Sequence, residues 1–276
     1  MNGSLYLVPV PIGDGDPADE LAPRVLRIAA GLRDFVVENE RSARRFLCRV
    51  MAQDALDASR FGVLDEHTRP EDVRALLAPL LAGRDVAILS EAGSPCVADP
   101  GAALVAEAAE AGIRVVPLPG PSSILMAVMA SGLGGQRFAF AGYLPPDQAG
   151  REAALRALEA DSRRQGSTQA FIETPYRNDA MVASAACALA PDTVFCAAIG
   201  LSTPEERIVR MTAAAWKAGP VRIGKKPTVF LLKAADGNRG GASGRDRRGG
   251  SPFDRKAQPD RKAPPDRKAP PRKRGS

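Results

Sequence analysis

The chain opens with a strand-like run and a loop, Leu5-Tyr6-Leu7-Val8-Pro9-Val10-Pro11-Ile12-Gly13, and this pattern recurs along the sequence. The first four residues of this stretch form an apolar run of strand length, which ends where prolines and a glycine begin a loop. Similar short apolar runs recur along the chain, at residues 35–37, 86–89, 115–116, 138–140, 170–172, 194–195 and 228–232. Buried apolar strands of this kind are typical of parallel or mixed sheets that are covered by helices.

Helical patterns separate these runs. The clearest pattern has apolar residues at i, i+3, i+4, i+7 and i+8, which are Val73, Leu76, Leu77, Leu80 and Leu81. It starts at Pro70 and stops before Gly83, so it predicts one helix over residues 70–81. The repeated alternation of strand and helix predicts an α/β fold. A change in composition near Gly120-Pro121 marks a candidate domain boundary.

Residues 235–276 differ in composition from the rest of the chain. They hold 13 Lys/Arg and 5 Asp/Glu, a net charge of +8, whereas the first 234 residues hold 25 basic and 27 acidic residues. This segment has six prolines, and no Leu, Ile or Val follows Lys233. We therefore expect a disordered basic tail. A mobile polycation releases counterions from a polyanion, so RNA is the expected partner. The alternative is a solubilising appendage without a dedicated partner.

The composition also argues against several classes of protein. The 276 residues are 45% hydrophobic and 25% charged, which is typical of a globular chain. No apolar run approaches the roughly 20 residues that cross a bilayer. The run at residues 5–10 is too short for a secretory signal, so we expect a cytoplasmic protein with no membrane partner. The four cysteines stand far apart and His67 is the sole histidine, so we expect reduced thiols and no metal site.

Three loops that follow predicted strands are rich in glycine, proline and small polar residues. They span residues 9–14, 90–101 and 117–123. In open α/β sheets, ligands bind beyond the carboxyl ends of the strands, which is where these loops begin. Glycine allows the backbone to approach a ligand closely, and proline lowers the entropy cost of ordering a loop. No loop has the spacing of a dinucleotide or nucleoside triphosphate site.

Taken together, the loops resemble the tetrapyrrole methylase superfamily, the class III S-adenosylmethionine-dependent methyltransferases. The resemblance lies in the opening stretch and in four later motifs, which are Ser90–Pro95, Asp99-Pro100-Gly101, Gly112–Ser122 and Gly142-Tyr143-Leu144-Pro145. Within the superfamily, they are most similar to the branch of ribosomal RNA small subunit methyltransferase I, which methylates a cytidine ribose 2′-hydroxyl. The resemblance implies two α/β domains, over residues 1–118 and 119–234, with largely parallel or mixed sheets.

The resemblance also implies a homodimer and S-adenosylmethionine as cofactor, bound in the cleft between the two domains without a metal. Matched by motif, the cofactor-binding residues of the first domain and the connection that follows it are Ile12, Ala92, Gly93, Ser94, Val97, Ser122 and Ser123. In the second domain they are Glu173 and Gly200. For these two, a purely structural role is the alternative.

Methylation of a ribose hydroxyl needs a base or a nearby charge, because this hydroxyl is a poor nucleophile. The candidate bases that follow strands or lie in the loops are Glu38, Glu40, Glu91 and Asp99; the candidates for phosphate contacts are Arg41, Arg44 and Arg177. Arg41 is the main catalytic candidate because it occupies a motif position after a strand, and Glu40 lies beside it. A helix cap or a solvated surface charge is the alternative for each.

The sequence departs from the RNA-methylating branch in several of its motifs, two of which lie at residues 38–41 and 198–206. Glu38-Asn39-Glu40-Arg41 stands where the branch has Glu-Asp-Thr-Arg, and Ala198–Glu206 replaces a motif that reads Arg-Glu-Leu-Thr-Lys followed by Glu. These departures leave two alternatives open. One is carbon methylation of a tetrapyrrole ring, either porphyrin or corrin. The other is a non-catalytic RNA-binding relative.

Overall fold

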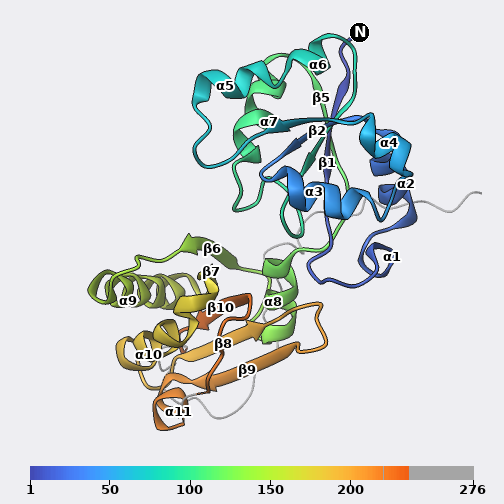
Figure 1. The fold of residues 1–276 in the computed structure, drawn as a ribbon. Helices are drawn as coiled ribbons and strands as arrows, with labels where there is room; N and C mark the ends of the chain where they lie inside the picture. Colours follow the sequence, from blue (N-terminus) through green and yellow to red (C-terminus); the bar gives the residue numbers. More distant parts are fainter. Residues whose placement is uncertain (220, 236–276) are drawn as a thin grey trace, which may run out of the picture. The chain divides into compact units, whose positions relative to one another are not determined.

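The computed structural model describes residues 1–219 and 221–235, which form two five-stranded sheets (Figure 1). The strands of the first sheet are β1 (Ser4–Val8), β2 (Asp34–Val37), β3 (Arg60–Val63), β4 (Val86–Leu89) and β5 (Arg114–Pro117). Their order is β3-β2-β4-β1-β5, and every pair is parallel. The carboxyl ends of all five strands therefore lie at one edge, and the three predicted loops begin there.

Helices cover both faces of this sheet. They are α1 (Pro17–Glu20), α2 (Pro23–Gly31), α3 (Glu40–Leu47), α4 (Gln53–Asp57), α5 (Pro70–Ala75), α6 (Ala78–Leu81) and α7 (Gly101–Glu110). Residues of α2, α3 and α4 pack in one apolar cluster with Ala87 and Leu89 of β4. Residues of α5, α6 and α7 pack in a second cluster with Val86 and Ile88. Successive side chains of β4 thus point to opposite faces, and both faces are buried, as in other parallel sheets.

The second sheet is mixed. Its strands are β6 (Phe138–Tyr143), β7 (Thr168–Ile172), β8 (Val194–Ile199), β9 (Arg207–Thr212) and β10 (Thr228–Lys233), in the order β6-β7-β10-β8-β9. Only β6 and β7 pair in parallel; the other three pairs are antiparallel. The prediction of two α/β units with parallel or mixed sheets is confirmed. The domain boundary at residue 118 stays a prediction, and the tail lies outside the described residues.

The second sheet is also covered on both faces. Its helices are α8 (Ser123–Ser131), α9 (Gln148–Gln165), the 3-10 helix η1 (Pro175–Arg177), α10 (Asn178–Ala188) and α11 (Ala213–Ala218). On one face, Phe171, Phe195 and Phe230 stack with ring centroids 5.6–6.3 Å apart. Trp216 of α11 packs edge-on against Phe195 and donates its indole N–H to the Phe195 carbonyl oxygen, at 2.9 Å. On the other face, α8 packs through Ala127 and its neighbours.

The structure differs from the sequence-based expectation in three elements. The single helix predicted over residues 70–81 is wrong, because α5 ends at Ala75 and α6 starts at Ala78. Pro79 has no N–H to donate to the Ala75 carbonyl, and its ring would clash with that carbonyl in a continuous helix. Strands β3 and β9 were not predicted. Both are edge strands of half-exposed residues, so neither contains the continuous apolar run of a central strand. None of the helices in the described part is long and apolar enough to cross a membrane.

Candidate functional site

The loops after β1 and β4 meet at the carboxyl edge of the first sheet. These two strands pair in parallel, and the pairing is followed by an isolated antiparallel bridge between Val10 and Gly93. The bridge consists of two backbone hydrogen bonds of 3.0 and 3.1 Å. Gly93 has a φ of +74°, a left-handed conformation that favours glycine. The Ser90 hydroxyl donates to the Gly93 carbonyl oxygen at 2.6 Å and fixes this turn.

The third loop joins the second through the Ser94 side chain. The Ser94 hydroxyl donates to the Pro121 carbonyl oxygen at 3.0 Å. A Cβ on Gly93 would lie 3.1 Å from the same oxygen, so these loops can approach closely only at a glycine. Ser122 is the N-cap of α8, and its hydroxyl accepts from the Leu125 N–H at 3.5 Å. Ser94 and Ser122 therefore hold backbone in place, whereas Ser123 lies at the first position of α8.

The first loop is held by a carboxylate. The backbone N–H groups of Ile12 and Gly13 donate to the two oxygens of Glu20, at 2.9 and 3.0 Å. A Cβ on Gly13 would lie 2.2 Å from the carbonyl oxygen of Ser202, in the loop after β8. Glycine is required here because the loop after β1 touches the loop after β8.

An apolar cavity of ≈ 270 Å³ lies where these loops meet. It is lined by Ile12, Ala92, Ser123, Tyr143, Ile172, Glu173, Pro175, Ala198, Gly200, Leu201, Thr203, Pro227, Thr228 and Val229. Five of the nine predicted cofactor residues line it: Ile12, Ala92, Ser123, Glu173 and Gly200. They come from five separate segments of the chain, and the structure brings them together at one cavity.

Glu173 is the buried charge of this apolar cavity. Its carboxylate oxygen Oε1 accepts from the Thr174 N–H at 2.6 Å and from the Arg177 guanidinium at 2.9 and 2.5 Å. Its other oxygen, Oε2, is buried and has no hydrogen-bond partner in the described part of the chain. An unpaired buried carboxylate oxygen is costly, because water no longer solvates it. The Glu173 side chain has no exposed surface, so a ligand in the cavity reaches Oε2 only if neighbouring side chains move.

The remaining predicted cofactor residues lie in the loop backbone or at its surface. Gly93, Ser94 and Ser122 shape the loops, as described above. Val97 does not line the apolar cavity, and it is 50% exposed. The turn around it is tight, because Cys96 and Ala98 both have positive φ, at 65° and 61°. Asp99 stabilises this turn by accepting from the N–H groups of Cys96, at 2.8 Å, and Gly101, at 2.9 Å. Burial and the charge of Asp99 raise the pKa of the Cys96 thiol to about 12, which favours the protonated thiol at neutral pH.

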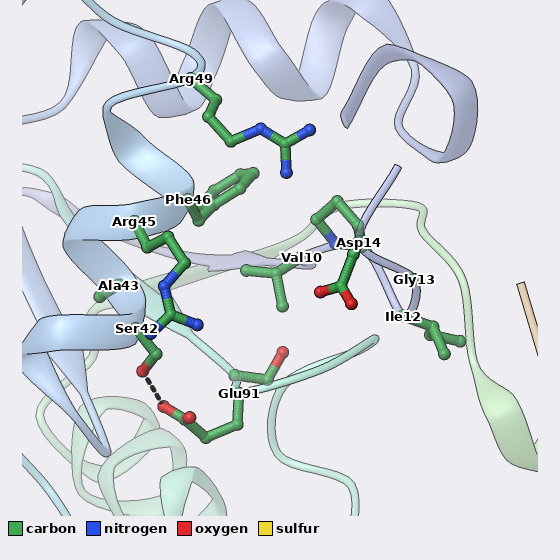
Figure 2. A pocket seen from close by; sticks show the side chains of 12 residues that line it. Val10, Ile12, Gly13, Asp14, Ser42, Ala43, Arg45, Phe46, Arg49 and Glu91 are labelled. Atoms are coloured by element: carbon green, nitrogen blue, oxygen red, sulfur yellow. Dashed lines mark hydrogen bonds between the residues drawn. The ribbon is translucent and has the colours of Figure 1, made fainter. Parts of the chain in front are cut away.

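A polar cavity of ≈ 130 Å³ lies between the loop after β1 and helix α3 (Figure 2). It is lined by Val10, Pro11, Ile12, Gly13, Asp14, Ser42, Ala43, Arg45, Phe46, Arg49, Ser90 and Glu91. Ile12 lines this cavity and the apolar one, so the two cavities are neighbours. Figure 2 shows two arginines on the helix side and two carboxylates on the loop side. The Ser42 hydroxyl donates to the Glu91 carboxylate at 2.6 Å and joins α3 to the loop after β4.

The two predicted catalytic residues line neither cavity. Arg41 and Glu40 are exposed in the first turn of α3. Glu40 pairs with Arg44 at 2.7 Å, and the Arg44 guanidinium lies 4.4 Å from the centre of the Phe61 ring. The structure places Arg45 and Arg49 at the polar cavity instead. The sequence places these two arginines close to Arg41, but which arginine meets the cavity depends on how α3 and the turn after it pack.

Glu38 is a carboxyl group whose pKa is strongly raised by its surroundings. It follows β2 and lines a small cleft with Asp99. Burial, together with the negative charges of Asp99 and Glu91, raises the pKa of Glu38 to about 7. A carboxyl group that titrates near neutral pH is suited to take up or release a proton at that pH. In the part of the chain that the structure describes, no group of His, Cys, Asp and Glu side chains is arranged to hold a metal ion.

The fold and the site define a class of protein that comparison with known proteins identifies. Residues 4–216 match the family described as Tetrapyrrole (Corrin/Porphyrin) Methylases, and the chain belongs to this family. It is similar to proteins named ribosomal RNA small subunit methyltransferase I. The protein from Pseudomonas aeruginosa is 36% identical over 175 residues, which are 63% of this chain and 58% of that protein. The protein from Micromonospora olivasterospora is 38% identical over 209 residues, which are 76% of this chain and 63% of that protein. The chain thus spans less than two thirds of these relatives.

Solved structures share the fold. The methyltransferase CobJ has a TM-score of 0.59 at 20% identity, over 87% of this chain and 97% of that one. A conserved hypothetical protein from Aeropyrum pernix K1 has a TM-score of 0.60 at 18% identity, over 86% of both chains. A uroporphyrin-III C-methyltransferase from Thermus thermophilus, complexed with S-adenyl homocysteine, has a TM-score of 0.51 at 22% identity, over 84% of this chain and 97% of that one.

Proposed function

We propose that this protein is an S-adenosylmethionine-dependent methyltransferase that methylates a ribose 2′-hydroxyl of small-subunit ribosomal RNA. The observation that carries the proposal is the apolar cavity, where three loops with the family motifs meet a buried carboxylate with one free oxygen. The substrate is proposed from the relatives at 36–38% identity, which are named for methylation of this RNA.

The residues of the apolar cavity fit S-adenosylmethionine. Ile12, Ile172 and Val229 provide apolar walls against which adenine and the thioether carbons can pack. Oε2 of Glu173 has no partner among the described residues, and a shift of its neighbours on binding would let it accept a hydrogen bond from the cofactor's ammonium or ribose hydroxyl groups. When bound, the cofactor supplies a methyl group on a positively charged sulfur. The other predicted cofactor residues, Gly93, Ser94, Val97 and Ser122, remain proposals as the loops that hold it.

The protein's main task is alignment. Methyl transfer is an in-line displacement, and holding the two reactants in contact supplies much of the acceleration. The polar cavity next to the apolar one offers the place for the acceptor. A base that takes the hydroxyl proton would assist. Among the candidates, Glu91 lines the polar cavity and Glu38 titrates near neutral pH, whereas Glu40 pairs with Arg44. Arg41 is proposed to contact the RNA backbone from the exposed turn of α3.

The test is methyl incorporation from labelled S-adenosylmethionine into small-subunit ribosomal RNA, both free and in small subunits, from cells that lack this protein. Incorporation at one ribose is the expected result. If calorimetry shows cofactor binding but no methyl group enters RNA, the proposal that RNA is the acceptor is wrong, and a tetrapyrrole acceptor would then be tested. If the protein does not bind the cofactor, the proposal that it is a methyltransferase is wrong, and a non-catalytic RNA-binding relative is favoured.

The proposed setting is cytoplasmic, with RNA as partner and a second copy of this chain as the dimer partner. Helix α8 supports the dimer. Its sequence is apolar on every face, and it leaves Leu125 and Met129 52% and 80% exposed. A helix that is apolar all round is normally covered on all sides. The basic tail is proposed to raise the local concentration of RNA without selecting a sequence.

A further inference from the structure

We propose that the polar cavity beside α3 binds the phosphodiester backbone of the acceptor RNA, with Arg45 and Arg49 as its phosphate ligands. This inference rests on the RNA methylation proposed above, and it names the part of the site that holds the acceptor. S-adenosylmethionine carries no phosphate, so a pair of arginines beside its cavity is not needed for the cofactor.

The packing of α3 and of the turn that follows it places these arginines at the cavity. Asn39 caps the helix by accepting from the N–H groups of Arg41 and Ser42, at 2.9 and 3.3 Å. Phe46 and Leu47 are buried against the first sheet and fix the rotation of the helix about its axis. Arg45 lies in the last turn of α3, which ends at Leu47, and Arg49 lies in the turn that follows the helix. Both side chains line the cavity (Figure 2).

Neither arginine is neutralised by a carboxylate. Among residues 1–219 and 221–235, the Arg45 guanidinium has no ion pair and no hydrogen bond, and the Arg49 guanidinium donates only to the neutral carbonyl oxygen of Gly15. The Arg44 guanidinium of α3 is not available in this way, because it pairs with Glu40 and packs on the Phe61 ring. A guanidinium that lines a cavity without a carboxylate partner has its donors available for an anion, and its planar fork matches two phosphate oxygens.

The two carboxylates of the cavity favour a nucleotide over a small free anion. Asp14 and Glu91 face the arginines and would repel a lone phosphate or sulfate ion. A ribonucleotide presents both an anion and hydrogen-bond donors, in its hydroxyl and base amino groups, so both kinds of side chain find a partner. Glu91 is already fixed by the Ser42 hydroxyl, so its position does not depend on the ligand.

The polar cavity lies next to the apolar cavity, so an RNA bound in it would be close to the cofactor. A ribose whose phosphate is bound by Arg45 and Arg49 lies beside the wall formed by Ile12, which also lines the apolar cavity. Methyl transfer requires acceptor and cofactor in direct contact, so anchoring the phosphate next to this wall aids alignment. The arginines position the acceptor and take no part in bond making.

The test compares Arg45→Gln and Arg49→Gln in the full chain with the matched control Arg74→Gln. Arg74 is exposed on α5 and has no ion pair within the described residues. RNA affinity is measured over a series of salt concentrations, and cofactor affinity is measured by calorimetry. We expect each cavity variant to lower RNA affinity about 10-fold and to reduce the slope of log K against log salt by about 0.7–0.9. KM for RNA should rise, whereas cofactor affinity and the control should not change.

A lysine variant tests whether charge alone is enough. Arg45→Lys retains the positive charge but not the planar fork, so the salt slope should recover and the affinity should recover only in part. If both glutamine variants match Arg74→Gln while the protein still methylates RNA, the inference is wrong and the proposed function stands. If the unaltered protein binds the cofactor but methylates no RNA, the proposed function fails first, and the inference fails with it.

Discussion

At the scale of single residues, the free oxygen of Glu173 distinguishes a ligand site from an ordinary cavity. Glu173→Gln keeps the size of the side chain and removes its charge. We expect cofactor affinity by calorimetry to fall at least about 10-fold, because a hydrogen bond to a charged group is worth about 1.5–3 kcal/mol. Glu152→Gln changes a carboxylate on α9 that lines neither cavity, and it should leave cofactor affinity unchanged. If both variants are folded by circular dichroism and bind the cofactor with equal affinity, Glu173 does not contribute to cofactor binding.

Glu38 gives the protein a pH dependence of stability. Its pKa is raised to about 7 in the folded chain, so between its ordinary pKa of 4.5 and 7 the folded state binds more protons than the unfolded state. Stability must therefore fall as the pH rises through this range. Glu38→Gln removes the penalty and should raise the free energy of unfolding at pH 8 by about 1–2 kcal/mol, with allowance for solvent near this half-buried group. Urea unfolding of the parent and the variant at pH 4 and pH 8 measures this difference in the free energy of unfolding. A variant that gains nothing at pH 8 would contradict the burial of this charge.

At the scale of elements, the first sheet has an ionic cluster at the amino ends of three adjacent strand segments. Asp34 at the start of β2 is buried and pairs with Arg60 of β3 at 2.6 Å and with Arg84, just before β4, at 3.2 Å. The hydrogen bond from Arg60 is the main cause of the lowered pKa of Asp34. The stability this gives is present above the ordinary pKa of 3.8 and is lost as the pH falls below it.

Asp34→Asn should therefore lower the free energy of unfolding at pH 7 by about 1–2 kcal/mol, because both arginines are half-exposed and partly screened. The difference between variant and parent should shrink as the pH approaches 3. Asp72→Asn breaks an exposed ion pair with Arg69 and serves as the control, with an expected change below about 0.5 kcal/mol. A loss no larger than that of the control would show that the three strands do not depend on this cluster.

At the scale of the whole molecule, charge is divided unevenly along the chain. Removing residues 236–276 deletes 13 Lys/Arg and 5 Asp/Glu. We expect RNA affinity to fall and its salt dependence to become shallower, because fewer counterions are released on binding. Cofactor affinity should not change, since no residue of this segment belongs to a predicted motif. RNA binding that is identical with and without the segment, at low and high salt, would leave it without a role in RNA recognition.

Much of the fold was predictable because its signals are local. A central strand of a parallel sheet is apolar on both faces, so residues such as Val86–Leu89 stand out in the sequence. The edge strands β3 and β9 do not stand out, because charged or small residues interrupt their apolar residues and both strands are partly exposed. The break between α5 and α6 was also available in the sequence, at Pro79, but the helical spacing of the apolar residues runs through it.

The loops of the site were predictable from the sequence, because glycines, prolines and small residues set the backbone conformation locally. Five predicted cofactor residues, from Ile12 to Gly200, line one cavity. Which charged side chains meet at the site depends on tertiary packing. The packing of α3 and of the turn after it places Arg45 and Arg49, but not Arg41, at the polar cavity. The packing around β7 buries one carboxylate oxygen of Glu173, which has no partner among the residues that the structure describes. Such choices depend on contacts between distant segments, which no local pattern records.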